Sequence, residues 1–176
     1  MTSSSNLSGT FKISSSPVQI LHRSFETDSG FERFTEALEK ILGHLPKDFE
    51  QDLGTRPQLA VQRVKSTAGD HDLMIVSVFD HGAVLNVKGA RTNAKLYLIG
   101  NPLTATDMTK HDIRAALYAP IRVLVYEPRA GQTSVEYDLP SSLVGQFGRD
   151  DVTQVELTVD AELEQALAQA AELSHQ

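Results

Sequence analysis

Short apolar segments rich in β-branched residues, each ended by a polar, glycine or proline break, restrict most strongly how this chain can fold. Runs of this length and composition are typical of strands that lie partly or wholly inside a sheet. Arg129-Ala130-Gly131 forms a turn between the last two runs, which predicts a hairpin. The predicted strands are residues 18–25, 73–79, 95–99, 121–126 and 133–137.

Segments whose apolar residues recur at helical spacing alternate with these strands. The clearest is residues 31–42, in which apolar residues return every three or four positions and Gly43 provides a stop. Residues 83–89 suit either a strand or a short helix, and we favour the helix. Further helices are predicted at residues 57–65, 107–118, 140–147 and 160–173.

The length of 176 residues suits one domain. Residues 1–16 contain seven serines and few apolar residues, which predicts a disordered leader before a single α+β domain at 17–176. The amino terminus lacks the basic start and apolar run of a secretory signal. The longest apolar runs are far below the roughly 20 residues that span a bilayer. We therefore expect a cytoplasmic protein with no membrane partner.

The net charge of −7 is concentrated at the carboxyl end of the chain. Seven acidic residues and one basic residue lie between Arg149 and Gln176, so the rest of the chain carries a net charge of about −1. This distribution offers no basic surface for a phosphate backbone, and we expect no nucleic-acid partner. The absence of cysteine excludes disulfides, thiolate metal ligands and cysteine nucleophiles.

Several short motifs follow one another in a fixed order through the middle of the chain. They are residues 79–82 (Phe-Asp-His-Gly), 97–102 (Tyr-Leu-Ile-Gly-Asn-Pro), 115–120 (Ala-Ala-Leu-Tyr-Ala-Pro), 122–126 (Arg-Val-Leu-Val-Tyr) and 137–143 (Tyr-Asp-Leu-Pro-Ser-Ser-Leu). In their order and spacing, over about residues 70–147, the chain resembles the domain-of-unknown-function family 302.

The resemblance implies a two-layer α+β fold, with a curved, mainly antiparallel sheet and helices packed on one face. It implies no activity. The chain departs from the family pattern after Gly100-Asn101-Pro102, where a loop containing Gly-Thr usually follows and this chain has Leu103–Met108. A ligand pocket shaped by that loop is expected to differ here, because a backbone without the glycine is less permissive.

Asp80 and His81 are the first candidates for chemistry, because they follow a buried strand and would stand on a rigid support. In one alternative they line a ligand pocket, and His81 is a candidate general acid or base. In the other, Asp80 caps the following segment and His81 stabilises the turn by bonding to the backbone. Neighbours in a strand point to opposite faces, so adjacency alone does not make them a pair.

Further ligand-binding candidates are Asn101, Met108, His111 and Tyr137. Asn101 lies in a turn whose N–H groups can hold an anion, although such turns also use asparagine for purely structural reasons. Met108 and His111 are predicted to share one face of the 107–118 helix, which would face solvent, a subunit interface or a ligand, while Ile113 and Leu117 face the core. Tyr137 ends a strand and can donate a hydrogen bond into a pocket.

The sequence identifies no reaction and no cofactor, and its histidines lack the spacing of a metal site. Our main hypothesis is a small-molecule-binding domain that self-associates, most simply as a homodimer. One alternative is an enzyme that uses His81 as general acid or base. Another is a protein-interaction module that docks a partner on the acidic carboxyl-terminal helix, although the apolar residues of that helix favour packing on the body.

Overall fold

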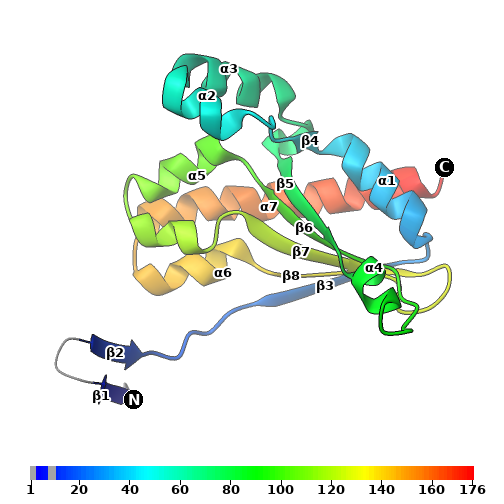
Figure 1. The fold of residues 1–176 in the computed structure, drawn as a ribbon, viewed down its shortest axis with the longest axis horizontal. Helices are drawn as coiled ribbons and strands as arrows, with labels where there is room; N and C mark the ends of the chain where they lie inside the picture. Colours follow the sequence, from blue (N-terminus) through cyan, green and yellow to red (C-terminus); the bar gives the residue numbers. More distant parts are fainter. Residues whose placement is uncertain (1–2, 8–10) are drawn as a thin grey trace.

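The computed structural model describes residues 3–7 and 11–176 (Figure 1). Its main element is a six-stranded sheet in the order β3-β8-β7-β6-β5-β4. Neighbouring strands are antiparallel except β4 and β5, which run parallel. The strands are β3 (His22–Thr27), β4 (Gly43–His44), β5 (Met74–Asp80), β6 (Ala94–Gly100), β7 (Ile121–Tyr126) and β8 (Thr133–Asp138).

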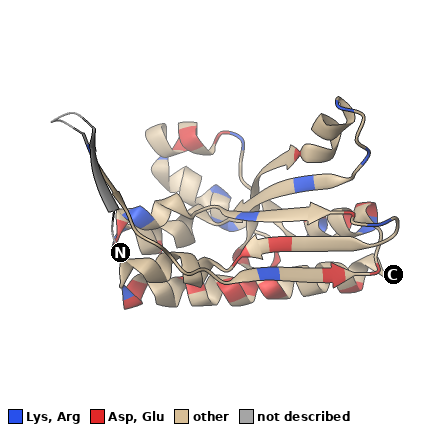
Figure 2. Cartoon of the chain, turned by 90° about the horizontal axis from the view of Figure 1, so that it is seen from below, with Lys and Arg blue, Asp and Glu red and all other residues tan. Residues whose placement is uncertain are grey.

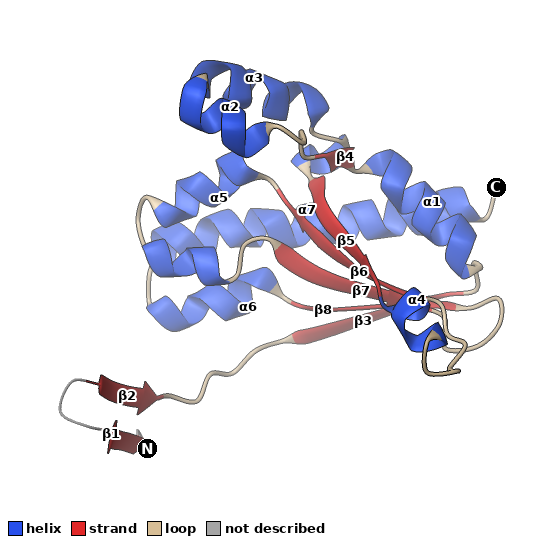
Figure 3. Ribbon diagram, viewed as in Figure 1, coloured by secondary structure: helices blue, strands red, loops and turns tan. Residues whose placement is uncertain are grey.

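Helices α1 (Phe31–Ile41) and α7 (Asp150–Ser174) pack against each other and against one face of the sheet (Figure 3). Seen from below, the long helix α7 runs beneath the strands and carries acidic residues along its length (Figure 2). The other helices are α2 (Phe49–Thr55), α3 (Pro57–Thr67), α4 (His81–Asn86), α5 (Pro102–Thr109) and α6 (Pro140–Val144), with 3₁₀ turns η1 (Asp70–Asp72), η2 (Ile113–Leu117) and η3 (Gly145–Phe147).

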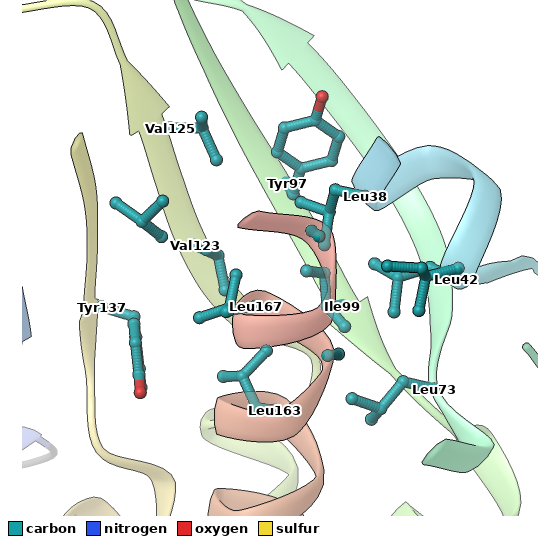
Figure 4. Packing of buried hydrophobic residues seen from close by; sticks show 14 of the residues in the cluster. Leu38, Leu42, Leu73, Tyr97, Ile99, Val123, Val125, Tyr137, Leu163 and Leu167 are labelled. Atoms are coloured by element: carbon teal, nitrogen blue, oxygen red, sulfur yellow. The ribbon is translucent and has the colours of Figure 1, made fainter. Parts of the chain in front are cut away.

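The larger apolar core lies between the sheet and helices α1 and α7. Leu163 and Leu167 of α7 lie against the strands that carry Val123 and Ile99, while Leu38 enters from α1 (Figure 4). Burying a leucine side chain of this kind contributes about 2 kcal/mol. A second, smaller cluster consists of Met108, Ala115, Val144 and Val152, and joins α5 and η2 to α6 and the start of α7.

A buried carboxylate holds α2 and α3 together. Asp52 is fully buried, and its two oxygens accept hydrogen bonds from the guanidinium groups of Arg56 and Arg63. Both arginines remain partly exposed, so they do not share the full desolvation cost of the aspartate. The pair of short helices is therefore fixed by one carboxylate as well as by apolar contacts.

The fold class implied by the family resemblance is confirmed, since the sheet is mainly antiparallel and helices pack on one face. The predicted strands correspond to β3 and β5 to β8, and the hairpin across Gly131 is formed by β7 and β8. The short helix favoured at residues 83–89 is α4, which begins two residues earlier than expected. Among the described residues, no helix has the length and apolar character needed to cross a membrane.

Residues 107–118 do not form the single helix that the sequence predicts. Helix α5 ends at Thr109, and the carboxylate of Asp112 then accepts a backbone hydrogen bond that starts the separate turn η2. This break changes the phase of the residues that follow. Met108, predicted on the face opposite the core, is 2% exposed, whereas Ile113 and Leu117, predicted in the core, are 74% and 76% exposed.

At the carboxyl end of the chain, the last helix begins at Asp150 rather than Asp160. At the amino end, the described strands β1 (Ser3–Leu7) and β2 (Phe11–Ser15) pair with each other and not with the main sheet (Figure 1). The division into a disordered leader at 1–16, part of which lies outside the described residues, and a domain at 17–176 stays a prediction.

Candidate functional site

A mainly apolar pocket of about 190 Å³ lies where the first half of α7 passes the ends of three strands. Its walls come from the start of β5, the end of β6, helix α5, the segment before β7 and one face of α7. It is lined by Leu45, Leu73, Val76, Ile99, Gly100, Asn101, Pro102, Thr104, Ala105, Met108, Ala119, Pro120, Ile121, Glu156, Val159 and Glu162.

The carboxyl group of Glu156 is the unusual feature of this pocket. The side chain is 2% exposed, and its Oε2 atom has no hydrogen-bond partner within the described protein. Burial, and secondarily the nearby charge of Asp160, raises the pKa of Glu156 to about 7. A buried polar atom without a partner is rare in folded proteins and calls for a specific explanation.

Asp160 lies one helical turn further along α7 and shows how a buried acid is normally satisfied. Its Oδ1 accepts a hydrogen bond of 3.1 Å from the backbone N–H of Ser141 at the start of α6. Burial raises the pKa of Asp160, and the hydrogen bonds from Ser141 oppose that shift. Asp160 therefore has a structural partner, whereas Glu156, which lines the pocket, has a carboxyl oxygen without one in the described protein.

Asn101 and Met108, both predicted to bind a ligand, line this pocket together. Asn101 caps α5, because its Oδ1 accepts a hydrogen bond of 2.9 Å from the N–H of Leu103. Its Nδ2 donates to the carbonyl of Asp72 at 3.1 Å, so the amide links α5 to η1. Asn101 thus shapes the pocket, while Met108, about two turns further along α5, supplies adaptable apolar surface.

The pocket is acidic in charge as well as apolar in surface. None of the described residues that line it is lysine, arginine or histidine. Its second carboxyl group belongs to Glu162, which is half-buried, and whose pKa is raised by burial and by the neighbouring carboxylate of Asp72. The electrostatic potential of the site therefore favours a neutral or cationic group over an anion.

Asp80 and His81 lie at the opposite end of β5 from this pocket. Strand β5 runs six residue steps from Met74 to Asp80, which is about 20 Å. The carboxylate of Asp80 accepts a hydrogen bond of 2.8 Å from the N–H of Ala83 and so caps α4. The ring of His81 is exposed and meets Phe79 edge-on at 4.6 Å between ring centres. No hydrogen bond joins Asp80 to His81 among the described side chains.

The other two candidate residues lie elsewhere in the fold. His111 is exposed, and its Nδ1 lies 3.2 Å from a carboxylate oxygen of Asp151 at the start of α7. Tyr137 is 5% exposed and packs in the larger core, where burial raises its pKa to about 12. The structure therefore brings Asn101 and Met108 together and leaves the remaining candidates at separate places.

Glu156 is not among the candidate residues predicted from the sequence, although its spacing along the helix provides a signal. Glu156 lies four residues after Val152, three before Val159 and seven before Leu163, all of which are buried on the inner face of α7. An acid at these intervals falls on the apolar face of a helix. Because the helix was predicted to begin at Asp160, this position was left outside it.

No group of three or more histidine, cysteine, aspartate or glutamate side chains is placed to hold a metal ion within the described part of the chain. The buried acids Glu156 and Asp160 are successive members of one helix face, and the second is already bonded to the backbone of α6. The chemistry that the two carboxyl groups of the pocket, Glu156 and Glu162, can offer is hydrogen bonding and charge pairing inside a mainly apolar wall.

Comparison with known proteins agrees with the resemblance found in the motifs. No curated protein matches the chain significantly. A crystal structure of an uncharacterized conserved DUF302 protein from Bacillus stearothermophilus is similar in fold, with a TM-score of 0.60 and 17% sequence identity over 85% of this chain and 97% of that one. The family model described as "Domain of unknown function DUF302" matches residues 49–170, well beyond the 70–147 identified from motifs. The chain belongs to the DUF302 family.

Proposed function

We propose that this protein binds a small, mainly apolar molecule in the pocket between α5 and α7, with Glu156 as the polar group that orients it. The observation that carries the proposal is a buried glutamate in the wall of an apolar cavity, one of whose carboxyl oxygens, Oε2, has no hydrogen-bond partner in the described protein. Ligand sites are commonly apolar concavities with a few well-placed polar groups, and this pocket has that composition.

The burial of Glu156 has a cost in folding free energy. Removing a carboxyl group from water without a compensating hydrogen bond costs on the order of 1–3 kcal/mol. Leucine or methionine at the same place on the helix would avoid that cost and extend the apolar face of α7. A ligand that bonds to the carboxyl group would recover the lost hydrogen bond, which gives the acid a role.

The catalytic alternative with His81 receives less support from the geometry. His81 is exposed, contacts Phe79 and lies far from the pocket, and the neighbouring Asp80 is engaged by the backbone of α4. It stays a prediction from the sequence, as do the roles of His111 and Tyr137 in binding. The cytoplasmic location and the absence of a nucleic-acid partner also stay predictions.

Self-association, the second part of our main hypothesis, would use the sheet face that α1 and α7 leave uncovered. Leu98 and the exposed Leu117 line a shallow hollow there, together with Arg122 and Asp138. An isologous contact uses the same patch on both copies, so it would bury the exposed side chain of Leu117 against the partner. Light scattering should then show a dimer, and Leu117→Glu should make it a monomer without loss of folding.

The binding proposal is tested by two-dimensional ¹H–¹⁵N NMR with 2-phenylethanol as a small apolar probe. We expect shift changes at Asn101 and Ala105, with a dissociation constant on the order of a millimolar. Thr104→Leu places a larger side chain in the pocket wall and should abolish these changes. Thr106→Leu, on the exposed side of the same helix, is the matched control and should keep them. Changes confined to residues around His81 would contradict the proposal.

A further inference from the structure

We infer that the pocket selects a small apolar molecule that carries a cationic amine, with Glu156 as its counter-ion. The inference rests on the proposed function and adds to it the charge of the ligand. Three features of the charged and polar groups around the pocket favour a cation over an anion or a neutral group.

The first feature is the state of the carboxyl groups. Glu156 presents an oxygen with no partner in the described protein, and Glu162 adds a second, half-buried carboxyl group to the same wall. The described lining offers no basic side chain that could neutralise either group. An ammonium group has three donors and no acceptor, so it matches a pocket whose charged lining groups are both carboxylates.

The second feature is the start of α5, where free N–H groups would attract an anion. Helix starts bind anions through free N–H groups. Here Pro102 has no N–H, and the N–H of Leu103 is already bonded to the side chain of Asn101. Two of the first three positions of α5 therefore offer no free N–H group, which makes the helix start a weak site for an anion.

The third feature is that the desolvation of Glu156 takes place when the protein folds and not when the ligand binds. Glu156 is already removed from water when the protein folds, so an incoming ammonium group meets a counter-ion that needs no further desolvation. An alcohol of the same shape can also donate a hydrogen bond to the carboxylate, but it brings no positive charge. The ammonium group adds the attraction between opposite charges, which we expect to give an affinity ratio of about tenfold or more.

The volume of the pocket limits the size of the ligand. A closed apolar cavity of about 150 Å³ accommodates benzene, and this pocket measures about 190 Å³. A phenyl ring with a two-carbon arm is therefore a suitable body, with its amine directed toward Glu156. Three matched probes have nearly the same shape: the cationic 2-phenylethylamine, the neutral 2-phenylethanol and the anionic phenylacetate.

The preference for the amine should increase with pH, because Glu156 must be ionised to act as counter-ion. Burial and the charge of Asp160 place the pKa of Glu156 at about 7. The other acids nearby are Glu162, which Asp72 faces from η1, and Asp107 on α5, which is paired with Lys110 just after the end of that helix. Helix α6 and the turn η3 contribute no titratable group. A primary amine stays protonated throughout this range.

The test is isothermal titration calorimetry of the full chain with the three probes at pH 5.5 and pH 8, in amine-free buffers. At pH 8 we expect 2-phenylethylamine to bind about tenfold or more tightly than 2-phenylethanol, and phenylacetate most weakly. The ratio of amine to alcohol should shrink at pH 5.5. Titration at pH 6.5 in two buffers of different ionisation enthalpy should show proton release on binding the amine but not the alcohol.

Two variants assign the effect. Glu156→Gln keeps the shape of the side chain and should bind amine and alcohol about equally at both pH values. Glu162→Gln should retain most of the amine preference. Equal binding of amine and alcohol to the wild type at pH 8, or an amine preference that survives Glu156→Gln, would overturn the inference but leave the proposed function standing. Failure of all three probes to bind would overturn both.

Discussion

Replacing Glu156 by glutamine is expected to stabilise the protein at pH 8 and to change its stability little at pH 5. In the unfolded chain this carboxyl group has its ordinary pKa of 4.5, whereas burial raises the pKa to about 7 in the folded protein. Between these values the folded protein holds a proton that the unfolded chain has released. The free energy of unfolding therefore falls as the pH rises from about 4.5 to about 7, and is constant above that range.

The size of the effect follows from the difference between the two pKa values. At about 1.4 kcal/mol for each pKa unit, the wild type loses about 3 kcal/mol of stability between pH 4.5 and pH 8. Glutamine has nearly the same shape and no ionised form, so the variant avoids this loss. At pH 5 the two proteins should agree within about 1 kcal/mol, since each buries one polar group of similar size.

The assay is urea denaturation of the unliganded protein at pH 5, 6, 7 and 8, in buffers without amines. Glu172→Gln, an exposed position on the same helix, is the matched control and should shift stability by less than about 0.5 kcal/mol at every pH. A difference between wild type and Glu156→Gln that is the same at pH 5 and pH 8 would refute the argument, because it would show that Glu156 is not desolvated in the folded protein.

Three further predictions follow from other parts of the fold. Leu163→Ala opens a cavity in the larger core and should lower the free energy of unfolding, measured by chemical denaturation, by about 3–5 kcal/mol. Leu117→Ala should lower it by less than about 0.5 kcal/mol, because that side chain is exposed. Comparable losses would mean that residues 107–118 form the single helix first predicted. Asp52→Ala should cost about 2 kcal/mol, because the arginines on either side lose their shared partner, and an unchanged midpoint would contradict that role. Hydrogen bonding to Asp138 raises the pKa of His22 above 6.5. The pair between His22 and Asp138 therefore stabilises the fold below pH 6.5, and this contribution is lost as the pH rises through the raised pKa. An NMR titration of the His22 ring should show its pKa return toward 6.5 in Asp138→Asn.

Much of the fold could be predicted from the sequence because local pattern and tertiary environment agree there. The strands β5 to β8 combine β-branched composition with clear breaks at Asp80, Gly100 and Gly131, and α1 has a single apolar stripe. The layer arrangement did not follow from these patterns. It came from the ordered motifs shared with the DUF302 family, since period alone does not specify which face of a sheet a helix covers.

The candidate site was predicted less well, for identifiable physical reasons. A single helical phase was extended through Asp112, whose side chain in fact starts a new turn, and this misplaced Met108, Ile113 and Leu117. The start of α7 was not predicted because the segment from Asp150 to Val159 is acidic and weakly apolar. Its helical structure is stabilised by packing on α5 and α6. The burial of Glu156 depends on that packing, which local spacing does not reveal.

The pocket lies at the boundary between two apolar clusters of unequal size. Ile99 and Val159 on one wall belong to the larger core, while Met108 on the other belongs to the small cluster of α5, η2 and α6. Small clusters with few buried side chains open locally at a lower free energy than the whole fold. An occupant that touches both walls would therefore couple the small cluster to the larger core, and its binding should raise the free energy at which the small cluster opens.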